Sequence, residues 1–173
     1  MEVERIGKRI DVDMTRLITL LIMVVLSSSL KAQSFTSCVS DAETCISKLK
    51  EVEKLVASSI QNTEAIKATA QQTANPQQYI DFVVLRYERN NHKIQLAIVQ
   101  ATNEAIKNLS AFIGKSEVDQ VVLKEGITKY SDMSATAHKF ANELQEKFFD
   151  HFSAYLNNYG YDCESIFRQD NMD

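Results

Sequence analysis

The chain has 173 residues, a length that fits one domain with a buried core. It carries 19 Lys and Arg against 23 Asp and Glu, and the net charge of −4 argues against nucleic acid or an anionic membrane surface as a partner. Four glycines, one proline and no tryptophan provide too few turn residues for a β-rich scaffold and favour a few long helices.

A short apolar run, residues 17–26, lies near the N-terminus between Arg16 and three consecutive serines. A basic flank, an apolar run and a small residue at a cleavage point are typical of a secretory signal peptide. We therefore expect residues 1–32 to be an N-terminal extension and signal peptide that is removed after Ala32, with Met14 as an alternative start. The mature protein would be secreted, or lie in the periplasm or cell envelope of a bacterium.

Two alternatives to cleavage remain open. An uncleaved anchor is disfavoured because a membrane span needs about 18 apolar residues or more, so we expect no span after processing. Lipidation of Cys38 is disfavoured because the polar residues Lys31, Gln33 and Ser34 separate it from the apolar run.

The first predicted helix covers residues 40–74, after a short leader segment at 33–39. Ser40 and Glu43 have the spacing of a capping box at its start. Apolar residues then recur in steps of three and four, which is typical of an amphipathic helix. The helix is expected to end before Asn75 and Pro76, because a proline disfavours helical geometry at the residue that precedes it.

The second predicted helix covers residues 76–113. Asn75 is a good N-cap and Pro76 a good first residue, while Gly114 is a typical C-terminal cap. Between them the apolar stripe continues at the same spacing.

The third predicted helix covers residues 117–159, and its stripe includes Val122, Phe140, Phe148 and Tyr155. Gly126 predicts a kink or break, since an interior glycine costs about 1 kcal/mol relative to alanine. Gly160 follows the helix, and residues 161–173 are expected to form an acidic flexible tail.

These three helices predict an all-α fold. Their connections are short, so neighbouring helices should run antiparallel. The sequence therefore predicts an elongated, antiparallel, up-down-up three-helix bundle over residues 40–160.

The three cysteines are Cys38, Cys45 and Cys163. In this topology Cys163 lies at the opposite end of the bundle from the other two, beyond the reach of about 7 Å between Cα atoms that a disulfide allows, unless the third helix folds back at Gly126. Cys38 and Cys45 could form a disulfide only if residues 38–40 curl back over the first turn. Cys163 is then a free thiol or the link of a disulfide-bonded homodimer.

Catalytic, cofactor and metal sites are not predicted. His92, His138 and His151 lack the spacing of a metal site, and Glu88 with His92 is interpreted as a solvated pair. Arg86, Arg89, His92 and Lys93 form a mild basic cluster, which is usually a solvated helix face.

An aromatic run towards the end of the third helix is the densest apolar feature. The candidate apolar contact surface consists of Phe148, Phe149, Phe152 and Tyr155, in which Phe149 lies off the stripe. Asn108 opens an Asn-Leu-Ser glycosylation pattern, which matters only in a eukaryotic secretory pathway.

These observations favour an exported, non-enzymatic helical protein. One hypothesis is a binding protein that uses a helix face or an inter-helix cleft for a protein or an apolar small molecule. The alternative is a structural or self-assembling extracellular or envelope protein, including a homodimer.

Overall fold

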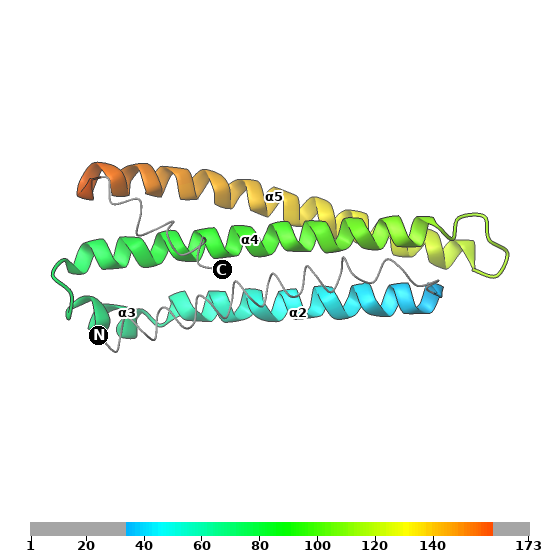
Figure 1. The fold of residues 1–173 in the computed structure, drawn as a ribbon, viewed down its shortest axis with the longest axis horizontal. Coiled ribbons are helices and arrows are strands. Elements are labelled where there is room, and N and C mark those ends of the chain that lie inside the picture. Colours follow the sequence, from blue (N-terminus) through cyan, green and yellow to red (C-terminus); the bar gives the residue numbers. More distant parts are fainter. Residues whose placement is uncertain (1–33, 161–173) are drawn as a thin grey trace, which may run out of the picture. The chain divides into compact units, whose positions relative to one another are not determined.

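The computed structural model describes residues 34–160. Of these, 87% are helical and none forms a strand, which confirms the all-α prediction. The elements are α2 (Phe35–Gln61), α3 (Thr63–Ala70), α4 (Pro76–Ser110) and α5 (Gln120–Tyr159), traced in Figure 1. The expected signal peptide, Cys163 and the acidic tail lie outside the described residues.

The first helix begins earlier than predicted, because Ser34 rather than Ser40 caps it. The backbone N–H of Ser37 donates to Ser34 Oγ at 3.2 Å, as expected for an N-cap. Phe35 packs edge-to-face on Phe112, with ring centroids 5.8 Å apart. The capping box at Ser40 is therefore wrong, and most of the predicted leader segment belongs to α2.

A break at Asn62 divides the predicted helix 40–74 into α2 and α3. The hydroxyls of Ser58 and Ser59 donate to the carbonyls of Leu55 and Val56, bonds that compete with regular helix geometry. Asn62 Oδ1 then accepts the N–H of Ala65 at 3.3 Å and caps α3.

The start of α4 matches the prediction. Asn75 Oδ1 accepts the N–H of Gln78 at 3.2 Å, and Pro76 is the first helical residue. Gly114, in the connection after α4, has φ of +77°, a conformation that glycine adopts without a steric penalty.

Helix α5 begins at Gln120 rather than residue 117, because Asp119 is its cap: Asp119 Oδ1 accepts the N–H of Val121 at 2.8 Å. The helix then continues through Gly126, contrary to the expected break. A Cβ at Gly126 would lie 3.5 Å from Leu109 Cδ1, which is ordinary van der Waals contact, so Gly126 faces α4 without a steric need for glycine.

The chain divides into two compact units. Unit 1 is Met1–Glu53 with Ile94–Phe140, and unit 2 is Lys54–Lys93 with Ala141–Asp173.

Unit 1 is a helical bundle with an apolar interior built from parts of α2, α4 and α5. Its buried side chains include Leu49, Val52, Ile94, Ile98, Leu109, Leu123 and Tyr130. Hydrogen bonds link the helices at its edge, from Gln95 to Glu53 at 2.7 Å and from Ser134 to Asn103 at 3.0 Å.

Unit 2 has an aromatic interior. Leu85 of α4 and Tyr155 of α5 are buried together, and Phe82, Phe148, Phe152 and Tyr159 pack against them.

Two residues of the predicted stripe on α5 are exposed. Val122 is 49% exposed and Phe140 is 50% exposed, whereas Leu123, Tyr130 and Ala137 are buried at successive steps of seven residues. The seven-residue repeat keeps one face towards the neighbouring helices, and Val122 and Phe140 lie beside that face.

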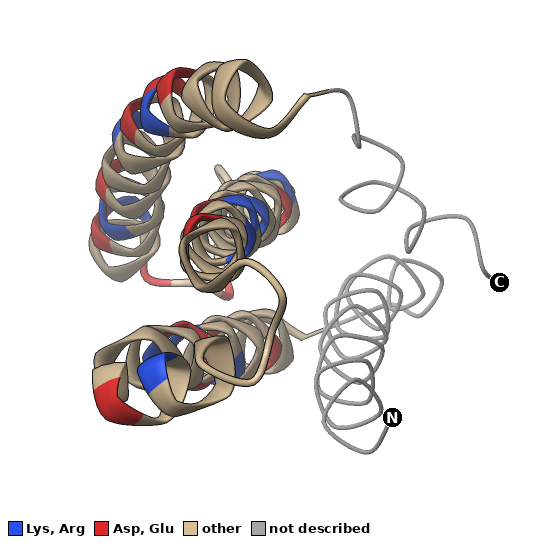
Figure 2. Ribbon diagram, turned by 90° about the vertical axis from the view of Figure 1, so that its left-hand side faces the viewer, with Lys and Arg blue, Asp and Glu red and all other residues tan. Residues whose placement is uncertain are grey.

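Acidic and basic residues are interspersed along the helices (Figure 2). None of the helices in residues 34–160 has an apolar stretch of the length and hydropathy that crossing a membrane requires.

Candidate functional site

Unit 1 contains a groove of about 880 Å³ between the N-terminal half of α2 and the first part of α5. Its apolar lining comes from Phe35, Val39, Val122 and the ring of Tyr130. More of its lining residues are polar or charged than apolar. The polar and charged ones are Thr36, Ser40, Glu43, Thr44, Ser47, Lys48, Glu51, Glu125 and Lys129. Concave sites that combine apolar and polar lining residues can bind small molecules, and this groove has both kinds.

An ion pair joins the two walls of this groove. Lys129 Nζ donates to Glu43 Oε1 at 3.0 Å, and both side chains are more than half exposed. The hydrogen bond to Glu43 raises the pKa of Lys129, so the ammonium stays charged at neutral pH. The pair therefore marks a polar rim rather than a source of much stability.

Tyr130 supplies the one buried polar atom of the groove lining that lacks a partner among the described residues. The residue is only 2% exposed, and its hydroxyl is buried without a hydrogen bond. Burial, with a contribution from the Glu43 charge, raises the pKa of this phenol, so it remains a neutral donor. An unpartnered buried hydroxyl costs about 1–3 kcal/mol, which a ligand with a hydrogen-bond acceptor could recover.

The predicted aromatic contact surface is divided by the structure. Phe148, Phe152 and Tyr155 lie in the interior of unit 2, and the Phe148 and Phe152 rings stack with centroids 5.6 Å apart. Phe149 is 54% exposed, and its ring packs edge-to-face on that of Phe148, with centroids 6.0 Å apart. The structure thus leaves Phe149 as the exposed member.

Hydrogen bonds between α4 and α5 fix the aromatic interior of unit 2. Tyr155 Oη accepts a hydrogen bond from Gln78 at 3.1 Å, and Tyr159 Oη donates to Asp81 at 2.7 Å. The hydrogen bond to Asp81 raises the pKa of Tyr159.

Glu88 forms a buried carboxylate–imidazole pair that the sequence did not predict. Glu88 is 6% exposed, and its Oε1 lies 2.7 Å from Nδ1 of the half-exposed His151. The interpretation of Glu88 and His92 as a solvated pair is therefore wrong, because the carboxylate is buried. Burial lowers the pKa of His92 itself.

The two described cysteines lie inside α2 as buried thiols, and the disulfide between Cys38 and Cys45 is not seen. Seven residues of regular helix separate their Cα atoms by about 10 Å, beyond the disulfide limit. The expected curl at residues 38–40 does not occur because α2 already begins at Phe35. Burial raises the pKa of both thiols, which lowers the fraction of thiolate, the reactive form.

Asn108 is half-buried on α4, and the hydroxyl of Ser110 in the same pattern donates to the carbonyl of Ile106 at 2.7 Å. Glycosylation at Asn108 stays a prediction.

Within residues 34–160, no three His, Cys, Asp or Glu side chains are close enough together to hold a metal ion.

The groove was not predicted because most of its lining residues lie off the predicted stripes, with Val122 and Tyr130 as exceptions. Only Tyr130 carried a signal, as a polar aromatic on the stripe whose hydroxyl needs a partner when buried. The pairing of Glu43 with Lys129, 86 residues apart, has no local signature.

Comparison with protein-family models, curated proteins and solved structures found no match to this chain.

The Glu88–His151 pair predicts a specific stability effect. Replacing His151 with Ala leaves the buried carboxylate without its partner and should lower the free energy of unfolding by about 1–2 kcal/mol. His138→Ala, at an exposed position of the same helix, should change it by less than about 0.5 kcal/mol. Urea unfolding at pH 7 measures both, and equal effects would contradict the role of the pair.

Proposed function

We propose that the protein is exported and acts as a non-enzymatic binding protein, with the groove of unit 1 as its ligand site. The observation that carries this proposal is that Tyr130, whose buried hydroxyl has no hydrogen-bond partner among the described residues, belongs to the lining of this groove. It favours a ligand with an apolar body and a hydrogen-bond acceptor, such as a fatty acid.

Export rests on the N-terminal sequence. The apolar run at 17–26, with Arg16 before it and Ala32 after it, supports removal of residues 1–32. The mature chain would begin at Gln33, next to Ser34, which caps α2.

The long helices support the finer fold that we propose for the mature chain, an elongated, antiparallel, up-down-up three-helix bundle. Its first helix is interrupted at Asn62, between α2 and α3. In unit 1, all three long helices contribute to the apolar interior.

A self-assembling extracellular or envelope protein is the second candidate. Cys38 and Cys45 are buried with raised pKa values, so an intermolecular disulfide would form through Cys163. The exposed ring of Phe149 would offer such a homodimer an apolar contact.

Export predicts the N-terminus of the mature protein. When the chain is expressed in a host with a general secretory pathway, N-terminal sequencing of the exported protein should begin at Gln33. Leu21→Arg, which places a charge in the apolar run, should leave the protein unprocessed inside the cell. Export of a protein that retains residues 14–32 would contradict cleavage.

The groove predicts binding of a fluorescent fatty acid, for which dansyl-undecanoic acid is a suitable probe. Ser40 is exposed and lines the groove, so Ser40→Trp should fill it. The dissociation constant of the probe should then rise at least tenfold. Ser131→Trp places the same side chain on an exposed position of α5 outside the lining and should change it less than twofold.

Tyr130→Phe removes only the hydroxyl and keeps the ring. In the same titration it should weaken binding about three- to tenfold, the value of one hydrogen bond. No fluorescence change with the wild-type protein, or equal losses in the two tryptophan variants, would exclude the groove as the site.

The homodimer hypothesis predicts a redox-dependent change in gel mobility. Under non-reducing conditions a disulfide dimer should disappear in Cys163→Ser and persist in Cys38→Ala, because Cys38 is buried. A wild-type protein that runs as a monomer under both conditions contradicts the disulfide-linked assembly.

A further inference from the structure

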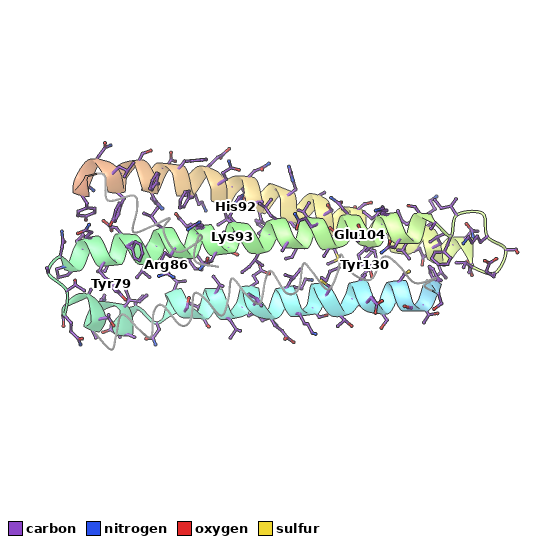
Figure 3. The ribbon with its side chains drawn as sticks, in the orientation of Figure 1. Tyr79, Arg86, His92, Lys93, Glu104 and Tyr130 are labelled. Carbon is purple, nitrogen blue, oxygen red and sulfur yellow. The ribbon has the colours of Figure 1, made fainter. Side chains whose placement is uncertain are left out.

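The lining of the groove in unit 1 carries an excess of one negative charge. Its carboxylates are those of Glu43, Glu51 and Glu125, against the two ammonium groups of Lys48 and Lys129. Tyr130, labelled in Figure 3, adds no charge because burial raises the pKa of its phenol. A ligand that brings one positive charge would leave the occupied groove neutral, whereas a carboxylate would double the excess.

The ammonium group of Lys129 is already engaged, so it offers little to an anionic head group. It donates to Glu43 Oε1 at 3.0 Å, from one wall of the groove to the other. It also lies over the Tyr130 ring, 5.7 Å from the ring centroid, which is the distance of a cation–π contact. An anion that displaced Glu43 from Lys129 would leave two negative groups side by side, so the exchange gains little.

Glu125 is the carboxylate that borders the apolar part of the lining. It lies one helical turn after Val122 on α5. Lys129 lies one turn further along the same helix, but its ammonium pairs with Glu43 of α2 instead. Glu125 itself forms no ion pair with any residue of 34–160. Its charge is therefore available to a ligand whose apolar body lies against Val122.

The other two charged residues of the lining, Lys48 and Glu51, largely offset each other. They are three residues apart on α2, so their side chains are neighbours on the helix surface. With Glu43 paired to Lys129, the uncompensated charge of the lining is that of Glu125. Because Glu125 is exposed, water and salt weaken its field, and its effect on binding should be modest and salt-dependent.

We propose that the groove selects an amphiphile with one positive charge, whose ammonium head group pairs with Glu125 while its apolar body lies against Phe35, Val39 and Val122. The inference rests on the proposed function and names the ligand charge that this function leaves open. A fatty acid has the apolar body and the hydrogen-bond acceptor, but its carboxylate meets the excess negative charge. Glu125 is thus a specificity-determining residue of the groove.

Three fluorescent probes with the same tail measure this charge preference. Each has a dansylaminoundecyl chain, and the chains end in trimethylammonium, in a primary amide or in carboxylate. At pH 7 and low salt the wild-type protein should bind the ammonium probe about three- to tenfold more tightly than the carboxylate probe, with the amide probe between them. Sodium chloride at about 0.5 M should bring the three dissociation constants together, because it screens the charge of Glu125.

Glu125→Gln should reduce the ratio of ammonium to carboxylate affinity to less than about twofold and leave the amide probe unchanged, because it removes only the charge. Lys48→Gln should increase the ratio, because it adds to the negative excess of the lining. Glu146→Gln makes the same change in net charge as Glu125→Gln at an exposed position of α5 outside the lining. This control should keep the wild-type ratio.

The outcomes separate this inference from the proposed function. If none of the three probes binds the wild-type protein, the groove is not a ligand site and both are wrong. If the three probes bind equally, or the carboxylate probe binds most tightly, the groove remains the site and the charge preference alone is overturned. A wild-type ratio in Glu125→Gln would likewise overturn the role of Glu125.

Discussion

Close packing around α4 is the constraint on which unit 1 depends. The part of α4 that belongs to unit 1 is hydrogen-bonded to α2 through Gln95 and to α5 through Asn103. It therefore packs against a neighbouring helix on each of two sides. Small residues at a spacing of four, Ala97, Ala101 and Ala105, are buried among larger apolar ones and let the neighbouring helices approach. Gly126 of α5 faces Leu109 of α4 in this packed region, and α5 continues through it as one helix.

Unit 2 is held together differently, because polar groups share its interior with aromatic rings. Glu88 of α4 is buried and pairs with His151 of α5. Hydrogen bonds also join Gln78 and Asp81 of α4 to the hydroxyls of two tyrosines of α5, Tyr155 and Tyr159. Such bonds add direction to aromatic packing, since each polar end must find a partner when the ring is buried. They therefore favour one register between α4 and α5 over others that would bury the same rings.

The two kinds of interior leave different surfaces. In unit 1 the helices use apolar residues to pack, and mostly polar residues beside the buried stripe line the proposed groove, together with Tyr130. In unit 2 two acidic residues of α4, Asp81 and Glu88, are engaged by Tyr159 and His151 of α5.

Helix content could be predicted from the sequence because its signals are local. Asn75, Pro76 and Gly160 act on their own neighbours, and the structure places them as predicted. Gly114 has the positive φ of a turn glycine, but α4 already ends at Ser110, so Gly114 is not the predicted cap of that helix. The break at Asn62 was not predicted. Other features depend on residues far apart in the chain. Whether Val122 or Leu123 is buried, and which partner Glu43, Glu88 or Tyr130 meets, depends on the register of the packed helices. The sequence by itself determined the helical character, while only the tertiary structure decided the groove and the contact between Glu88 and His151, because packing alone brings those distant side chains together.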